Sequence, residues 1–196
     1  MVMSRRQFVV ISGAGLLTAC TGKPPPEPAV EKPIITFRHR PPIGFDVARI
    51  DIQQPFVSKG VPPNVEHLLT NPPARVAERW ALDRLKTRGD NGLARYSILD
   101  ASIVEKQLKT DKSLQSLFKT QVDTLYEGRI EIRLDVQNAG GSGFATAIVT
   151  RSQTVKEDLT LNERDALLIE FVEQMGRDLD ARMNDEILRS LSRFMR

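Results

Sequence analysis

The feature that most constrains the fold is a run of strict alternation between residues 126 and 136. Every second position is apolar or glycine, and every position between them is charged. The first set is Tyr126, Gly128, Ile130, Ile132, Leu134 and Val136, and the second is Glu127, Arg129, Glu131, Arg133 and Asp135. Successive side chains of a strand point to opposite faces of the sheet. The run therefore predicts a strand with one covered and one wet face, as antiparallel sheets have.

Two further segments are predicted to lie beside this strand. Residues 138–143 have the composition of a hairpin turn, and residues 144–155 return along the sheet as its partner. Residues 94–108 are rich in Ile, Val and Tyr, but Asp100 and Ser102 interrupt one face. We therefore predict a third antiparallel strand with a bulge.

A shorter strand and a helix are predicted before these three strands. Residues 45–52 alternate as a strand does. Asn71 is the expected N-cap of the helix, Pro72 belongs to its first turn, and Gly89 is its natural stop. Apolar residues recur between these ends at helical spacing: Val76, Ala77, Trp80, Ala81 and Leu85. Trp80 is on this stripe and is expected in the core.

The C-terminal part predicts a second, much longer helix. Thr160 and Glu163 fit a capping box. Apolar residues then step by three or four almost to the end of the chain: Leu168, Val172, Met175, Leu179, Met183, Ile187, Leu191 and Phe194. A straight helix from Leu161 to Phe194 is about 50 Å long. Two alternatives stay open: its last turns overhang the domain and meet another chain, or its end is frayed or bent, with a break near Asn184.

The element order is therefore β-α-β-β-β-α, which predicts an α+β fold. We expect a two-layer sandwich in which two main helices cover one face of a mostly antiparallel four-stranded sheet. The expected domain spans residues 45–196, and its length suits a single domain.

The N-terminus has the order of an export signal. Arg5 and Arg6 form a basic start, and a short apolar stretch diluted by serine and glycine follows at residues 8–17. No stretch of about 18 or more apolar residues occurs in the sequence, so an ordinary spanning helix is excluded. The segment Ser4-Arg5-Arg6-Gln7-Phe8 also resembles the twin-arginine export motif, without the lysine often found after it. Both that route and the general secretory route stay open.

Residues 17–20, Leu17-Thr18-Ala19-Cys20, resemble the lipobox of bacterial lipoproteins. The resemblance implies cleavage before Cys20, acylation of Cys20, and removal of residues 1–19 as a signal peptide. Cys20 is the only cysteine of the chain, so no internal disulfide forms. The alternative is a soluble secreted protein cleaved near Ala19. Thr21, after the cysteine, resembles lipoproteins sorted to the outer membrane.

Residues 20–44 are expected to form a tether. Five prolines between residues 24 and 33 disfavour helices and sheets and favour extended polyproline. Thirteen such residues span roughly 40 Å, enough to hold a domain away from a lipid surface. A ligand for a proline-binding protein is the alternative.

Charge gives no support to a nucleic-acid partner. The chain holds 28 Lys and Arg against 25 Asp and Glu, a net charge of +3. Removal of residues 1–19 takes away Arg5 and Arg6 and leaves about +1. Membrane attachment must therefore come from acyl chains, and stable anchoring needs more than one.

No residue pattern indicates an enzyme. His39 and His67 lie in proline-rich loops, and no H-E-x-x-H, C-x-x-C, Walker or G-x-S-x-G motif occurs. Two charged pairs on the last helix have the spacing of exposed pairs: Glu173 with Arg177, and Asp178 with Arg182. We therefore expect no catalytic group, metal or cofactor.

The charged face of the strand at residues 126–136 allows two interpretations. We favour the first, in which its opposite charges satisfy one another on a wet sheet. In the second it is a docking face, because an uncovered sheet can take another layer.

The element order is similar to that of the lipopolysaccharide-assembly lipoprotein and of the auxiliary lipoproteins of lipid-transporting ABC systems. The likeness covers the topology of residues 45–196 and the lipobox, so only Cys20 carries over as a site residue. It implies a non-catalytic accessory at the outer membrane, anchored by its acyl chains, with its domain in the periplasm of a Gram-negative bacterium. Its expected role is binding or scaffolding in transport or assembly of lipid or lipopolysaccharide. The alternatives are a structural lipoprotein that stabilises an envelope protein complex or forms oligomers through its C-terminal helix, and, more remotely, an envelope hydrolase.

Overall fold

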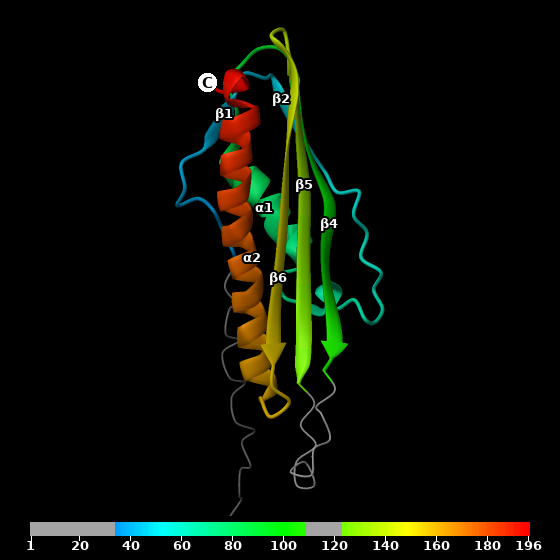
Figure 1. The fold of residues 1–196 in the computed structure, drawn as a ribbon. Coiled ribbons are helices and arrows are strands. Elements are labelled where there is room, and N and C mark those ends of the chain that lie inside the picture. Colours follow the sequence, from blue (N-terminus) through cyan, green and yellow to red (C-terminus); the bar gives the residue numbers. More distant parts are fainter. Residues whose placement is uncertain (1–33, 109–122) are drawn as a thin grey trace, which may run out of the picture. The chain divides into compact units, whose positions relative to one another are not determined.

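The computed structural model describes residues 34–108 and 123–196. The predictions made for Arg5, Arg6, Leu17, Ala19 and Cys20 lie outside these ranges. The main sheet consists of β2 (Arg49–Gln53), β4 (Leu93–Gln107), β5 (Thr124–Asn138) and β6 (Gly141–Val155). The two α-helices, α1 (Pro73–Arg84) and α2 (Leu161–Ser190), lie together on one side of it (Figure 1).

The strand order β2-β4-β5-β6 confirms the α+β prediction and makes the sheet mixed. β4 pairs antiparallel with β5, and β5 with β6, whereas β2 runs parallel to β4. The parallel pair follows from the connection, because α1 lies between β2 and β4 in the chain and a crossover of this kind returns the strand in the same direction.

The three long strands confirm the sequence patterns in detail. Buried and half-buried residues alternate along β5, and its apolar set faces the helices. The register between β4 and β5 shifts between Ile98 and Asp100, which is the predicted bulge, and leaves Leu99 41% exposed. The hairpin turn is shorter than predicted: Asn138 lies opposite Gly141, so only two residues connect the strands.

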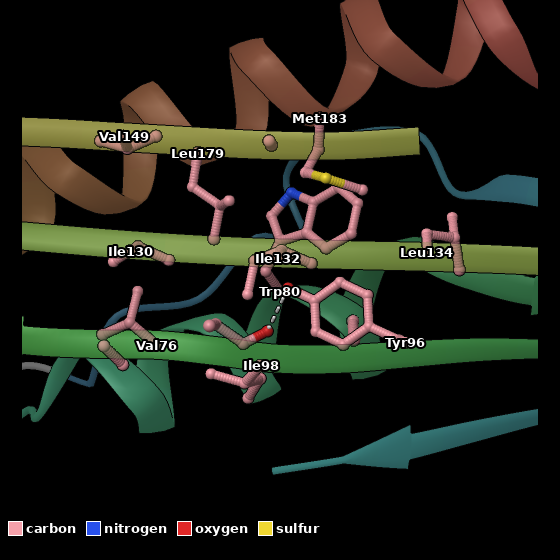
Figure 2. Close-up of a cluster of buried hydrophobic side chains, with 14 of the residues drawn as sticks. Val76, Trp80, Tyr96, Ile98, Ile130, Ile132, Leu134, Val149, Leu179 and Met183 are labelled. Atoms are coloured by element: carbon pink, nitrogen blue, oxygen red, sulfur yellow. Dashed lines mark hydrogen bonds between the residues drawn. The ribbon is translucent and has the colours of Figure 1, made fainter. Parts of the chain in front are cut away.

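The core fills the space between the helices and the sheet. Trp80 and Tyr96 are fully buried and stacked, with ring centroids 5.7 Å apart. The Tyr96 hydroxyl donates a hydrogen bond of 3.0 Å to the carbonyl of Ala77 in α1 (Figure 2). Burial raises the pKa of Tyr96 well above its ordinary value, so the hydroxyl stays neutral and donates. Trp80 is a core residue, as predicted.

The long helix begins as predicted and ends differently. The Thr160 side chain accepts from the Glu163 N–H, and the Glu163 carboxylate accepts from the Thr160 N–H, which completes the capping box. Of the two alternatives left open for its end, the overhang is wrong, because Ile187, Leu191 and Phe194 are almost fully buried. The bent end is confirmed, since α2 stops at Ser190 and a 3-10 turn follows at Ser192–Phe194. A 30-residue helix is about 45 Å long, and 15-residue strands are about 50 Å long, so the sheet is long enough to cover the helix to its C-terminal end. The helix also continues through Asn184 without a break.

The N-terminal half departs further from prediction. The single strand expected at residues 45–52 is two, β1 (Ile43–Phe45) and β2, and β1 pairs in parallel with the short β3 (Leu85–Thr87). α1 therefore ends at Arg84 rather than at Gly89, because Leu85 enters that pairing. The N-cap is Pro72 rather than Asn71, since the helix begins at Pro73.

Short 3-10 turns, η1 (Glu66–Leu68) and η3 (Ser192–Phe194), complete the fold. Phe37 and Ile43, which belong to the segment expected to be tether, are buried in the core. Within residues 34–108 and 123–196, we find no helix with the length and apolarity needed to cross a bilayer.

Candidate functional site

The outer sheet face, defined as the outward-pointing residues of β4, β5 and β6, carries a ladder of ion pairs. Arg129 Nη2 lies 2.6 Å from Glu131, and Arg133 Nη2 lies 2.7 Å from Asp135, both within β5. The hydrogen bond with Asp135 raises the pKa of the Arg133 guanidinium above its ordinary value. Two pairs join β4 to β5: Lys106–Glu127 at 2.6 Å and Asp100–Arg129 at 3.3 Å. The interpretation that these charges satisfy one another is confirmed, and the docking interpretation stays a prediction.

An apolar border runs beside this ladder along the edge strand β6. Phe144 is 54% exposed and Ile148 is 46% exposed, and they lie opposite Asp135 and Glu131 in the register. The Arg133 guanidinium carbon lies 4.0 Å from the centroid of the Phe144 ring, a cation–π contact that holds this aromatic side chain in place.

Two hollows border the outer sheet face, and the larger one also reaches Ser190 of α2. One of about 820 Å³ is lined by residues that include Arg95, Arg133 and Phe144, and one of about 440 Å³ by residues that include Glu127, Arg129 and Thr150. No charged residue occurs between Gly141 and Thr150. The face therefore combines a neutralised polar centre with an uncharged, partly apolar rim.

The opposite, helical side holds a buried ionic cluster around Asp180 of α2. Asp180 Oδ1 accepts hydrogen bonds of 2.8 Å from Trp80 Nε1 and of 2.8 Å from Arg84 Nε. Asp180 Oδ2 lies 3.3 Å from Arg40 Nε. The Arg84 side chain is only 4% exposed, and its Nη1 has no hydrogen-bond partner in the described part of the chain. A buried guanidinium is stable there because Asp180 compensates its charge.

The segment from Ile34 to Arg40 lies against this cluster and is held by α1. Asp83 Oδ2 accepts from Thr36 Oγ1 at 3.0 Å and from the Phe37 N–H at 2.9 Å, while Oδ1 pairs with Arg38. Burial raises the pKa of Asp83, but these hydrogen bonds outweigh it and the net shift is downward.

The ring of Phe37 packs where α2 carries Gly176. A Cβ at Gly176 would lie 3.2 Å from that ring and 3.0 Å from Val76, so a side chain there would push against both. The segment therefore depends on a glycine in α2 and on a carboxylate in α1.

A cavity of about 320 Å³ remains between this segment and α2. Its apolar lining comes from Ile34, Ile35, Phe37 and Ile169, and its polar lining from Thr36, His39, Arg40, Glu173, Arg177 and Asp180. Sequence reasoning missed this site, because Asp180 is 100 residues from Trp80 and no local pattern joins them. The only local sign of the site in the sequence is Asp180, which lies beside the apolar stripe of α2.

The predicted charged pairs of α2 behave differently from one another. Arg177 and Glu173 form the expected exposed pair at 2.8 Å. Asp178 pairs instead with Arg151 of β6 at 2.7 Å, and Arg182 pairs with Glu186. The structure places His39 at the cavity and His67 in η1. Among the residues that the structure describes, no three or more His, Cys, Asp or Glu gather as a metal site would require.

No protein-family model matches the chain, and no curated protein does. Among solved structures, a minor lipoprotein from Acinetobacter baumannii is similar with a TM-score of 0.37 and 10% identity, over 73% of this chain and 95% of that one. Rare lipoprotein B from Shewanella oneidensis is similar with a TM-score of 0.32 and 16% identity, over 71% of this chain and 96% of that one. At these scores and identities, the two likenesses decide neither the fold nor the function.

Proposed function

We propose that this chain is a non-catalytic bacterial envelope lipoprotein that presents its outer sheet face to a protein of an envelope complex. In this proposal Cys20 carries the acyl anchor, residues 1–19 are removed on export, and the domain faces the periplasm from the outer membrane. The role is that of an accessory binding or scaffolding module in transport or assembly of envelope lipid or lipopolysaccharide.

The observation that supports docking is the pairing of a neutralised ion-pair ladder with exposed apolar side chains. Ion pairs already formed on β5 keep the surface wettable without a partner. Phe144 and Ile148 offer apolar area that becomes buried when a partner covers the sheet. Such a surface suits a protein partner, because its charges are already paired while its apolar rim is still exposed to water.

The C-terminal helix gives no support to oligomer formation. Its apolar stripe is covered by the sheet of the same chain, including Met183 and Ile187. We therefore place the contact with other proteins on the sheet rather than on the helix.

The anchor is tested by labelled palmitate. The wild-type chain expressed in a Gram-negative host is expected to incorporate label, and Cys20→Ala is expected to incorporate none. Label in Cys20→Ala would refute the anchor.

Docking is tested by photo-crosslinking from two matched positions. A photoreactive residue at Ile148, 46% exposed on β6, is compared with one at Leu82, 49% exposed on α1. We expect a discrete protein adduct from Ile148 alone, and its loss when Phe144→Asp is added while the melting temperature holds. Equal adducts from both positions, or an adduct unaffected by Phe144→Asp, would contradict docking through the sheet.

A further inference from the structure

The cavity beside Asp180 has the two properties of a small-molecule site. Its volume of about 320 Å³ lies at the lower end of the range of about 300–1,000 Å³ that ligand pockets occupy. Its lining combines an aliphatic and aromatic part with a few convergent polar groups, which fix the orientation of a ligand. The cavity lies on the helical side, away from the outer sheet face.

The charges around the cavity do not balance. Glu173 and Asp180 line it as anions, and both are already engaged: Glu173 with Arg177, and Asp180 with Arg40 and Arg84 together. Among the described residues, the guanidinium groups of Arg40, Arg177 and the buried Arg84 behind the lining therefore share two carboxylates, which leaves one positive charge. Asp180 leaves part of the Arg84 guanidinium unsatisfied, because Arg84 Nη1 has no hydrogen-bond partner among the described residues.

The surplus charge is accessible from the cavity. The Arg40 side chain is 56% exposed and the Arg177 side chain is 55% exposed, and both line the cavity. Arg40 uses its Nε for Asp180, and its guanidinium has further N–H donors that suit the two oxygens of a carboxylate or a phosphate.

The apolar part of the lining selects against a bare inorganic anion. The exposed Ile34 and the half-buried Ile35 and Ile169 gain from contact with an alkyl chain, because each methylene removed from water contributes to binding. A ligand with one anionic head and one aliphatic chain would satisfy both halves of the cavity.

We propose that this cavity binds a single-chain anionic amphiphile, an alkyl carboxylate or alkyl phosphate, with its head between Arg40 and Arg177 and its chain against Ile169. This site is separate from the docking surface on the sheet and does not depend on it. The acyl groups of the proposed anchor carry no such anionic head, and the test removes them so that they cannot compete for the cavity.

The chain contains its own reporter. Trp80 is the only tryptophan, it is fully buried, and its Nε1 donates to Asp180, which lines the cavity. Fluorescence of the full chain with Cys20→Ala, which removes the anchor's acyl groups, is titrated with decanoate and with decyl phosphate below their micelle concentrations. Acetate and inorganic phosphate supply the head alone, and decyl maltoside supplies the chain without charge.

We expect saturable binding of decanoate or decyl phosphate, at least about tenfold tighter than of acetate, inorganic phosphate or decyl maltoside. The tighter of the two alkyl anions identifies the head group. Equal binding of decyl maltoside would show an uncharged acyl site, equal binding of the bare anions would show an anion site without a chain, and no saturation would show no site. Each of these three results overturns the proposal.

Substitutions of residues that line the cavity test whether the ligand binds there. Arg40→Gln is expected to weaken decanoate binding about tenfold, because it removes a charged donor. Arg49→Gln is the matched control, since Arg49 is 69% exposed in an ion pair with Asp51 on β2. Ile169→Phe narrows the cavity without removing a charge and is expected to weaken decanoate more than acetate. If Arg40→Gln does not fold, Arg177→Gln replaces it, and unchanged binding in the folded variant refutes the site.

Discussion

The ionic cluster around Asp180 allows a sharp test of how the two helices are held together. Replacing Asp180 by leucine leaves the Arg84 guanidinium, 4% exposed, buried without a counter-charge. Breaking a buried pair from one side costs about 3–5 kcal/mol. The Trp80 N–H loses its acceptor as well. Arg40 contributes little, because its side chain is 56% exposed and returns to water.

A loss of this size is a large part of the stability of a domain, which is typically about 5–15 kcal/mol. For a chain of this length, about 2–4 °C of melting temperature corresponds to 1 kcal/mol. Asp180→Leu is therefore expected to lower the melting temperature by about 6–20 °C. Circular dichroism on heating and urea unfolding measure it. Asp178→Leu is the matched control in the same helix, since Asp178 forms an exposed pair and is expected to cost about 1 kcal/mol or less.

The double variant Arg84→Met with Asp180→Leu separates the charge from the packing. Removing both partners of a buried pair is often close to neutral, so the double variant is expected to be more stable than Asp180→Leu by about 2 kcal/mol or more. Asp180→Leu within about 1 kcal/mol of wild type, or a double variant no more stable than Asp180→Leu, would refute the assigned role.

Three further perturbations follow from the described contacts. Ile132→Asp places a charge at a fully buried position of β5 and is expected to unfold the domain at 25 °C; an unchanged melting temperature contradicts the assigned face. Burial raises the pKa of Glu66, but hydrogen bonds from Ser58 and the Ile103 N–H outweigh it and hold the pKa below 4.5. Because the pKa of Glu66 is lower in the folded than in the unfolded state, the ionised carboxylate stabilises the folded protein above about pH 4.5. This contribution disappears as the pH falls through the folded-state pKa. The difference in unfolding free energy between wild type and Glu66→Gln should therefore shrink below pH 4.5, and a constant difference from pH 7 to pH 3 would be the contrary result. Gly128→Ala places a Cβ 2.5 Å from Met175 Sδ and should cost about 1–3 kcal/mol in urea unfolding, whereas Gly140→Ala in the exposed turn should cost less.

Local periodicity carried most of the fold prediction. The alternation in β5, the interrupted alternation in β4 and the capping box at Thr160 each depend on residues a few positions apart, and the structure confirms all three. The α+β class followed from their order. The parallel pairing of β2 with β4 was implicit in the same order, because a helix connects the two strands.

The candidate site could be predicted only in part. The charged face of β5 was visible in the sequence, because its partners are two residues apart in the same strand. The cavity was not visible, because its lining joins residues near position 37 to residues near position 175, and neither segment carries a distinctive motif. The anchor prediction at Cys20 depends on sequence alone.

The amino-acid order by itself determined the three long strands, most of the two helices, and which of their faces are apolar, because those properties repeat over two to four residues. The tertiary structure alone decided three things: that the end of α2 is covered by its own sheet, that Asp180 holds Trp80 and Arg84, and that Asp83 holds the segment at Phe37. Each of these depends on contacts between residues about 40 to 100 positions apart. Such contacts depend on the lengths and packing of whole elements, which no local pattern encodes.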